Sequence, residues 1–418
     1  MYTNAELREF ISENDIKFIR LSFVDLDGTQ KNVAVMADLI DDILENGLTI
    51  NSTIVDKETN KNIELCLYPD INTLHILPWR PQHGRVARFI CDIKNIDKTD
   101  SYFDSRHILK KVVSDLKKNG LNVNIGTDSE FYLFKTDENN QPTYSTLDEA
   151  GYLDISPLDK SENVRREVCL TLEEMNIKPL SSHHEKGPGQ NEINFIRTGA
   201  LEACDNYVIF KSVVKAISNR NGVFASFMPK PIDNKNGNGL ALNIDIAKDG
   251  ESIFNNEKLK NIADGFIAGI LNRSKLGTIL FNSCPNSFER IGSCNAPKII
   301  SFNDKQDAFM RLAHKNGKKR LEIRSCDNSC NLYLLVSYIL ASGLEGIINN
   351  ELIDDFKETN LPTSFNDAIV LATENNFMFN LFGEKTFETF LKSKINLANE
   401  YTNVNDITEL KKRDFLRL

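Results

Sequence analysis

The sequence lacks the long apolar runs and the terminal features that mark membrane and secreted proteins. No apolar run in its 418 residues reaches the ~18 residues that a membrane-spanning helix needs. The first residues, Met1 to Glu6, contain neither a basic segment nor an apolar one, so no signal peptide is expected. These absences predict a cytoplasmic protein with no membrane partner.

Closely spaced cysteine pairs are also absent. The chain has 8 cysteines, none of them in a CxxC pair, and the nearest two, Cys326 and Cys330, lack the further partners of a zinc site. Scattered cysteines of this kind are typical of reduced thiols in a cytosolic protein. We therefore expect unpaired thiols rather than a disulfide framework.

An excess of basic residues is missing as well. The chain carries 50 Lys and Arg against 59 Asp and Glu, which gives a net charge of -9 at pH 7. This balance argues against nucleic acid or an anionic membrane as the main partner, although it leaves room for a local anion pocket. Hydrophobic residues at 41% and charged residues at 26% are ordinary for a soluble globular protein.

The length exceeds that of a usual single domain, and the chain has no internal repeat, low-complexity tract or long linker. Residues 1–100 have the pattern of a small α+β unit with a turn at Asp25-Leu26-Asp27-Gly28, and residues 101–418 form a second unit. Strands and helices do not alternate strictly, so an α+β sheet platform is favoured over a doubly wound sheet. Predicted strands cover residues 16–23, 29–35, 85–93, 122–134, 183–195, 224–227, 239–247 and 319–325, and predicted helices cover 5–15, 36–47, 105–119, 160–175, 202–220, 257–273, 331–349, 363–375 and 384–402.

The segment from Ser182 to Phe195 is the most informative part of the chain. Glu185 and Glu192 bracket the turn sequence Gly187-Pro188-Gly189, which can fold the chain into a hairpin. A hairpin brings the two carboxylates close enough to share one hard cation, and without a cation or a proton they repel. The alternative is a solvated hairpin with two surface glutamates.

Other predicted strands carry polar groups on one face. Residues i and i+2 of a strand share a face, so Asp128 lies beside Glu130, and Glu322 beside Arg324. A half-solvated sheet explains any one of these strands. It explains less well why so many of the polar residues are carboxylates. A carboxylate-rich concave sheet is a plausible site for Mg²⁺ or Mn²⁺.

Taken in order, these segments resemble the glutamine synthetase family over nearly the whole chain. The similarity includes the His183–Glu192 motif and the run Leu321-Glu322-Ile323-Arg324. Further similar segments are Gly151 to Asp159, Glu162 to Arg166, Phe227 to Pro231, Asn236 to Gly239, Asn286 to Arg290 and Asp406 to Leu416.

The resemblance implies an N-terminal β-grasp domain over residues 1–100. It also implies a catalytic domain over residues 101–418, of the glutamine synthetase/guanido kinase type, with a curved antiparallel sheet. It further implies a homo-oligomer, in the form of a double ring, with active sites shared between adjacent subunits. The family's chemistry uses ATP to phosphorylate the γ-carboxylate of glutamate, after which an amine attacks the acyl phosphate. Two cations and arginines stabilise the charge that moves in such a transfer.

Residue roles follow from the resemblance by position. Glu130, Glu185 and Glu192 match the family's first metal site, and Asp128 and Glu322 match ligands of the second, which holds the nucleotide phosphates. In the remaining matches, Asn236 and Gly237 contact the α-groups of glutamate, Arg290 and Arg324 grip glutamate and the reacting carboxylate, and Arg311 is a second arginine of the phosphate region. A bidentate guanidinium suits that task.

The sequence departs from the family pattern on the nucleotide side. Ala241 stands where the family has a histidine ligand of the second metal, and Asp128 where it usually has a glutamate. Asn243 and Asp245 occupy the next positions on that face, where an extra carboxylate repels phosphates. An arginine that grips phosphate aligns with Asp307. Each lost phosphate contact typically costs ~3 kcal/mol in the transition state.

The sequence also departs from the family pattern in the ammonium pocket. Asn51 aligns with an aspartate that helps to bind and deprotonate ammonium, and Asn295 with the glutamate of a flap. Both replacements are neutral. The glutamate side of the site is therefore retained, whereas the acceptor and ATP sides are changed.

Three functions stay open at this point. The first is an ATP-dependent ligase that acts on glutamate or a related acid with an acceptor other than ammonia. The second is a ligation-inactive protein that binds a glutamate-like ligand as a sensor or interaction partner. The third is ordinary glutamine synthetase. Fold alone does not decide between them, because function depends on the site.

Overall fold

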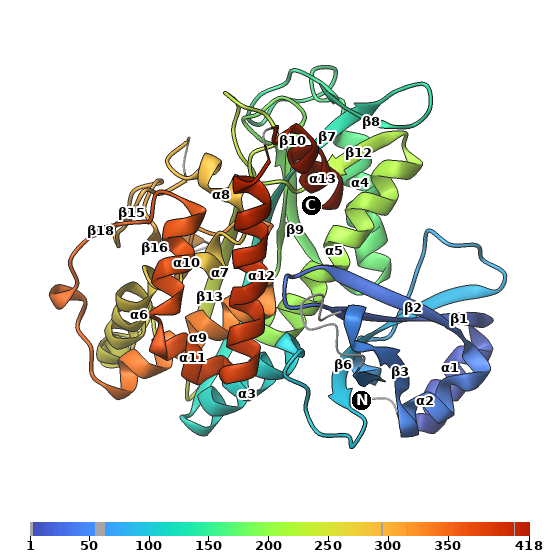
Figure 1. Cartoon of the computed structure of the whole chain (residues 1–418), viewed down its shortest axis with the longest axis horizontal. Helices are drawn as coiled ribbons and strands as arrows, with labels where there is room; N and C mark the ends of the chain where they lie inside the picture. Colours follow the sequence, from blue (N-terminus) through green and yellow to red (C-terminus); the bar gives the residue numbers. More distant parts are fainter. Residues whose placement is uncertain (1–2, 55–62, 294–295, 316, 405) are drawn as a thin grey trace.

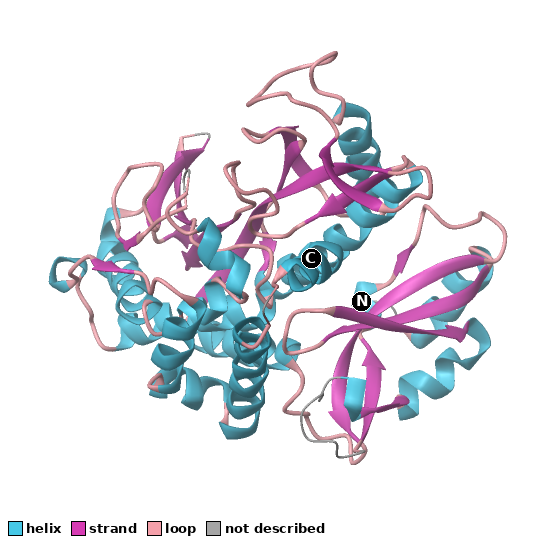
Figure 2. Cartoon of the chain, turned by 45° about the horizontal axis from the view of Figure 1, so that its top comes forward, coloured by secondary structure: helices cyan, strands magenta, loops and turns pink. Residues whose placement is uncertain are grey.

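Most described strands form a smaller and a larger sheet, which are separate in both views of the chain (Figure 1 and Figure 2). The structure is a computed structural model that describes residues 3–54, 63–293, 296–315, 317–404 and 406–418. Two further short strands, β15 (Ile299–Ile300) and β18 (Thr359–Asn360), pair with each other.

The smaller sheet has the order β2-β1-β6-β4-β3, and β5 pairs with β6. Strands β1 and β6 run parallel, whereas the other pairs are antiparallel. Helix α1 begins with a capping box, in which Thr3 and Glu6 satisfy each other's backbone N–H groups. The bounds are α1 (Asn4–Glu13), β1 (Ile16–Val24), β2 (Gln30–Met36), α2 (Ile40–Asn46), β3 (Leu48–Asn51), β4 (Glu64–Pro69), β5 (His75–Ile76) and β6 (Arg85–Asn95). The predicted small α+β unit is therefore present.

The larger sheet is antiparallel and is built around β7, a strand of 16 residues. Its main order is β16-β17-β13-β7-β10-β9; β8, β11 and β12 also pair with β7, and β14 pairs with β13. The bounds are β7 (Leu121–Thr136), β8 (Pro142–Thr146), β9 (Pro179–His184), β10 (Gln190–Phe195), β11 (Thr198–Gly199), β12 (Val223–Ser226), β13 (Leu240–Lys248), β14 (Glu251–Ser252), β16 (Met310–Lys315) and β17 (Lys318–Ile323). This sheet confirms the predicted α+β platform.

Helices pack against the larger sheet, and many of them, including α6, α9, α10, α11 and α12, lie in the left half of Figure 1. Helices α3 and α5 contact β7, and α9 packs against α3 and α6. The bounds are α3 (Ser105–Lys118), α4 (Glu162–Glu174), α5 (Ala200–Arg220), α6 (Lys260–Ser274), α7 (Thr278–Phe281), α8 (Pro285–Arg290), α9 (Leu332–Ile348), α10 (Phe365–Thr373), α11 (Asn376–Phe382), α12 (Glu384–Thr402) and α13 (Thr408–Arg417). Each helix predicted beyond residue 100 has a counterpart in this set.

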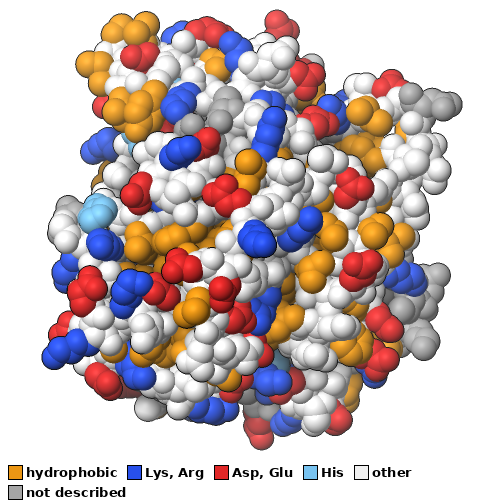
Figure 3. Space-filling model, turned by 90° about the vertical axis from the view of Figure 1, so that its left-hand side faces the viewer, with side chains coloured by type: hydrophobic (Ala, Val, Ile, Leu, Met, Phe, Trp, Pro, Cys, Tyr) orange, Lys and Arg blue, Asp and Glu red, His pale blue; other side chains and the backbone are white. Residues whose placement is uncertain are grey.

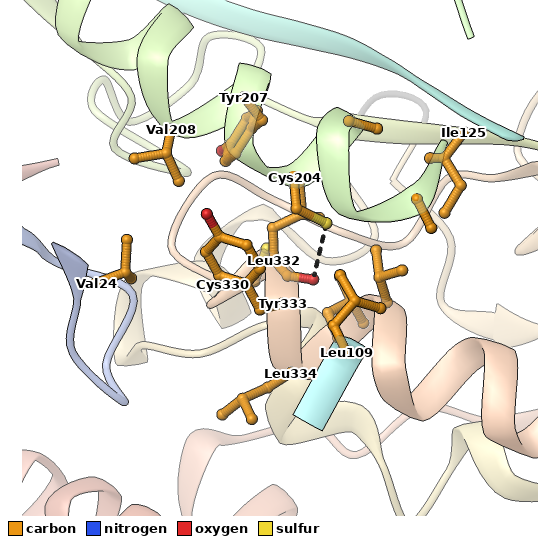
Figure 4. Packing of buried hydrophobic residues seen from close by; sticks show 14 of the residues in the cluster. Val24, Leu109, Ile125, Cys204, Tyr207, Val208, Cys330, Leu332, Tyr333 and Leu334 are labelled. Atoms are coloured by element: carbon orange, nitrogen blue, oxygen red, sulfur yellow. Dashed lines mark hydrogen bonds between the residues drawn. The ribbon is translucent and has the colours of Figure 1, made fainter. Parts of the chain in front are cut away.

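Part of the core lies where α5, α9 and α3 meet (Figure 4). Cys204 and Tyr207 of α5 face Leu332 and Tyr333 of α9, and the Cys204 thiol lies 3.8 Å from the Leu332 carbonyl oxygen. Burial raises the pKa of the Cys204 thiol well above its usual value. The seven described cysteines are free in this structure.

A buried arginine joins the two units. The guanidinium of Arg106, on α3, donates two hydrogen bonds to Asp205 of α5 at 2.8 and 2.9 Å. It also donates to Asp92 of β6 at 2.7 Å and to Asp70, after β4, at 2.8 Å. Strand β6 ends before residue 100 and α3 begins after it, so a boundary at residue 100 stays a prediction.

The surface mixes charges of both signs. On the face shown in Figure 3, acidic and basic side chains are interspersed with hydrophobic ones. Interspersed charges of this kind do not create a strong field of one sign over that face. None of the helices in the described ranges is both long enough and apolar enough to span a bilayer.

Candidate active site

The polar face of the larger sheet lines a cavity of about 520 Å³. Strands β7, β10, β13, β16 and β17 all contribute side chains to it, as do the segments that follow β9 and α8. Eleven of the twelve predicted site residues are described, and ten of these line this cavity, namely Asp128, Glu130, Glu185, Glu192, Asn236, Gly237, Arg290, Arg311, Glu322 and Arg324.

The hairpin predicted from the Gly-Pro-Gly sequence connects β9 and β10. The Glu185 backbone N–H donates to the Gln190 carbonyl at 2.8 Å, and the Gln190 N–H donates to Gly187 at 3.0 Å. Gly189 has a φ of +68°, a conformation that favours glycine. A Cβ on Gly187 would lie 2.0 Å from the Tyr132 hydroxyl. The turn therefore needs both glycines, and it places Glu185 at the cavity.

An acidic cluster forms where β9, β10 and β7 lie side by side. Glu192 lies directly opposite Glu130 on β7 and directly opposite His183 on β9. Ligand atoms of His183, Glu185 and Glu192 all lie within 4.8 Å of one another, so this group contains His183 where the sequence predicted Glu130. An oxygen-rich set of this kind suits Mg²⁺ or Mn²⁺. These residues therefore fit one divalent cation.

The protonation of the cluster reflects crowding of negative charge. Burial, with a smaller contribution from Glu185, raises the pKa of Glu130 to about 6. Burial and the charge of Glu130 raise the pKa of Glu192 well above its usual value. Burial alone also raises the pKa of Glu185, but hydrogen bonds from His183 and the Lys186 backbone outweigh it and lower that pKa. A bound cation relieves this repulsion.

The residues at the predicted second metal site differ from a set of metal ligands. Ala241 on β13 lies directly opposite Asp128 on β7, and Asn243 lies directly opposite Glu322 on β17. Ala241 has no ligand atom. Asp128 accepts a hydrogen bond from the Asn243 amide, and Glu322 accepts hydrogen bonds from two arginines. The residues present therefore do not fit a second cation.

Arginines surround Glu322 instead. Its two oxygens accept hydrogen bonds from Arg311 Nε at 2.7 Å and from Arg324 Nη1 at 2.6 Å. Burial raises the pKa of Glu322, but the hydrogen bond from Arg311 and the charges of both arginines outweigh it, so the pKa is lowered. Glu322 is therefore a charged carboxylate held by two guanidinium groups.

The backbone at Gly237 and Gly239 lies directly against the Arg290 side chain in the wall of the cavity. A Cβ on Gly237 would meet Arg290 Cγ at 2.9 Å, and one on Gly239 would meet its Nη2 at 2.9 Å. Arg290 is buried and donates to the Ser325 carbonyl at 3.1 Å, while the Gly239 N–H donates to Glu130 at 2.6 Å. The two glycines thus allow Arg290 to lie next to the acidic cluster.

A second group of potential ligands is already paired. Asp148, Asp159 and His184 are buried and lie close together. However, Asp148 accepts from His184 at 3.0 Å, and Asp159 accepts from Arg165 at 2.5 Å. Because its charges are neutralised within the protein, this group supports the hairpin rather than a metal ion.

Of the two predicted acceptor residues, one does not line the cavity and the other is outside the described part of the chain. Asn51 ends β3 in the smaller sheet and borders a separate surface hollow instead. Asn295 lies outside the described residues. Asp245, which the strand pattern placed on the nucleotide face, accepts a hydrogen bond from Ser252 at 2.6 Å and is not among the described lining residues.

The structure adds residues that the sequence reasoning missed. His183, two residues before Glu185, and Lys186, directly after it, line the cavity, as does Arg320. Arg320 was detectable, because it shares a strand face with Glu322 and Arg324. Past Arg320 and Asp128, a smaller cavity of about 270 Å³ continues with apolar walls formed by Leu180, Phe195 and Ile196.

Comparison with known proteins agrees with this architecture. Residues 15–96 match the family model "Glutamine synthetase, beta-Grasp domain", and residues 102–413 match "Glutamine synthetase, catalytic domain". The chain is 37% identical to glutamine synthetase of Clostridium saccharobutylicum, with 97% of each chain covered, and 34% identical to that of Staphylococcus aureus strain MRSA252, with 94% covered.

Solved structures share the fold. A Plasmodium falciparum glutamine synthetase superposes with a TM-score of 0.88 at 21% identity over 98% of both chains. A structure described as "GmaS/ADP complex-Conformation 1" superposes with a TM-score of 0.86 at 24% identity over 99% of both chains. The predicted β-grasp domain followed by a catalytic domain with a curved antiparallel sheet is thereby confirmed.

Proposed function

Because the chain belongs to the glutamine synthetase family of ATP-dependent ligases, we propose that it joins the side-chain carboxylate of glutamate, or of a related acid, to an amine other than ammonia. The observation that carries this proposal is the convergence of Glu130, Glu185 and Glu192 with Arg290 and Arg324 in one cavity. A cation held by carboxylates beside arginines is a suitable arrangement for activating a carboxylate by phosphoryl transfer.

Two steps balance the reaction. The γ-phosphoryl group of ATP passes to a carboxylate oxygen of the acid, and ADP leaves. The nitrogen of the amine then attacks the acyl carbon, the bond from that carbon to the phosphate oxygen breaks, and the proton that the nitrogen loses leaves with the phosphate. Glu130, Glu185 and Glu192 would hold a divalent cation, and that cation would supply positive charge to the carboxylate oxygens of the acid. Arg290 and Arg324 bind and orient the acid through bidentate contacts.

The nucleotide has a candidate place beside this cavity. The smaller cavity of about 270 Å³ shares Asp128 and Arg320 with the main one, and its walls include Leu180, Phe195 and Ile196. An apolar slot next to arginines suits a flat base attached to phosphates. This arrangement supports ATP as the second substrate.

The acceptor is proposed from the two asparagines. Neutral Asn51 and Asn295 replace carboxylates that attract ammonium in the family, so a larger or uncharged amine is the better match. Because Asn51 does not line the cavity of its own chain, we also propose a ring-shaped homo-oligomer in which this segment reaches the cavity of a neighbour.

Two other functions each have an observation in their favour. Ordinary glutamine synthesis is favoured by the relatives at 34–37% identity, which carry that name. Binding without ligation is favoured by Ala241 opposite Asp128 and by the pairing of Glu322 with two arginines, since both weaken the phosphate side.

The test measures phosphate release from ATP in the presence of glutamate, Mg²⁺ or Mn²⁺, and a panel of amines. Release that depends on one amine other than ammonia supports the proposal. Ammonia-dependent release at ordinary rates identifies a glutamine synthetase instead. Glutamate binding without ATP turnover identifies a binding protein. An Arg324→Lys variant, which keeps the charge but loses the planar fork, should lose at least tenfold in kcat/KM if the proposed contact exists.

A further inference from the structure

We propose that the cavity holds one divalent cation per chain rather than two, and that guanidinium groups supply the positive charge where the second cation would bind. This inference deepens the proposed function and rests on it. The family pattern predicts three ligands for the second cation, at positions 128, 241 and 322. The residues present there, Asp128, Ala241 and Glu322, do not form such a set.

The first part of the mismatch is a missing ligand. Ala241 lies directly opposite Asp128 in the β13–β7 ladder. Directly opposed residues on one face have Cβ atoms roughly 5 Å apart. A ligating side chain at position 241 would therefore reach the cation that Asp128 binds. The methyl group of alanine cannot do so.

The second part is the orientation of an amide. Arg320 Nε donates to Asn243 Oδ1 at 2.5 Å, and a guanidinium can only donate. The amide oxygen of Asn243 must therefore face Arg320, and its NH₂ group must face Asp128, to which it donates at 2.8 Å. Asn243 thus presents a hydrogen-bond donor to the carboxylate that should bind the cation.

The third part is Glu322, the other expected ligand. One of its oxygens accepts from Arg311 at 2.7 Å and the other accepts from Arg324 at 2.6 Å. Only 3% of Glu322 is exposed, so these contacts are shielded from water and strong. A cation at Glu322 would need to displace at least one of these half-buried guanidinium groups or lie beside both.

Negative and positive side chains lie at opposite ends of the cavity. The order β9-β10-β7-β13-β17-β16 places Glu185, Glu192 and Glu130 at one end of the cavity. At the other end, three arginines surround Glu322 and the Asn243 amide; these are Arg311, Arg320 and Arg324. The acidic end has the ligands for a cation, whereas the basic end already carries the charge that a second cation would provide.

The experiment counts bound Mn²⁺ on the full-length protein without substrates, from the electron paramagnetic resonance signal of free Mn²⁺ during a titration. We expect one equivalent per chain in the wild type. Glu192→Gln should weaken the affinity for this Mn²⁺ at least tenfold. Ala241→His should add a second equivalent, whereas Ala241→Phe, of similar size but without a ligand atom, should keep the count at one.

The outcomes are distinct. Two equivalents with affinities within tenfold of each other in the wild type overturn the proposal, and so does the absence of any bound Mn²⁺. If the wild type and Ala241→His both bind one equivalent of Mn²⁺, the alanine at position 241 is not the reason why the second cation does not bind, and that part of the proposal is overturned. Because the count is made without ATP or amine, it is independent of whether the proposed ligation is observed.

Discussion

Replacing Glu130 with glutamine should stabilise the metal-free protein and weaken its metal binding at the same time. Glu130 is partly buried, faces Glu192 across the β7–β10 ladder and accepts a hydrogen bond from the Gly239 backbone. Glutamine has nearly the same shape, and its carbonyl oxygen can accept the same hydrogen bond. The substitution therefore removes the ionisable group with little change in packing.

The magnitude follows from the pKa of Glu130, which burial and Glu185 raise from the usual 4.5 to about 6. At about 1.4 kcal/mol per pKa unit, ionising Glu130 at pH 7 costs the fold about 2 kcal/mol. Because Glu130 is partly exposed, water screens part of this cost, so about 1–2 kcal/mol is expected. Glu130→Gln should raise the free energy of unfolding by this amount at pH 7 with chelator present.

The direction in which the free energy of unfolding changes with pH provides a second test of this prediction. A carboxyl group whose pKa is raised by folding stabilises the folded state while it is protonated, and this contribution is lost as pH rises from the unfolded value of 4.5 through about 6. The wild type without metal should therefore lose this contribution between about pH 4.5 and 6. Glu130→Gln should lack this step, whereas the control Glu138→Gln, at an exposed position, should retain it.

Two assays are needed. Urea unfolding with a chelator measures the free energy of unfolding from pH 4 to 8, and calorimetric titration measures Mn²⁺ affinity at pH 7. We expect a more stable variant that binds Mn²⁺ at least tenfold more weakly. A variant that is less stable than wild type without metal, or that binds Mn²⁺ as tightly as wild type, would refute the reasoning.

Three further predictions concern other parts of the chain. Arg106→Met should lower the free energy of unfolding by about 3–5 kcal/mol in urea titrations, because Asp205 loses its charged partner and retains the hydrogen bond from the Tyr333 hydroxyl, and adding Asp205→Leu should recover part of that loss. Burial lowers the pKa of His75 to about 4, so the wild type should lose about 2–3 kcal/mol of stability through this residue as pH falls from 6.5 to 4, whereas His75→Gln should lack this loss, which the difference between the two melting temperatures over that range would show. Gly187→Ala should cost about 1–3 kcal/mol and reduce Mn²⁺ affinity, since its Cβ would lie 2.0 Å from the Tyr132 hydroxyl; an unchanged melting curve would contradict the close approach.

Local patterns predicted the elements that carry the site. The Gly187-Pro188-Gly189 turn predicted the hairpin, and the alternation at Asp128 and Glu130 predicted that they share a face of β7. Strand β16 was not predicted, although it brings Arg311 opposite Glu322. Its six residues are too few for a clear periodic signal, and its place is set by pairing with β17.

The order of the motifs along the chain was sufficient to determine the family and the acidic residues that face the cavity, because turn chemistry and strand alternation are local properties. The register between strands was decided only by the tertiary structure. It placed His183 opposite Glu192, set Ala241 against Asp128, and turned the Asn243 amide toward Asp128 through a contact with Arg320. These contacts join residues 9 to 115 positions apart in the sequence. Strand register and the orientation of an amide between such distant residues are set by tertiary packing, so they cannot be read from local sequence patterns.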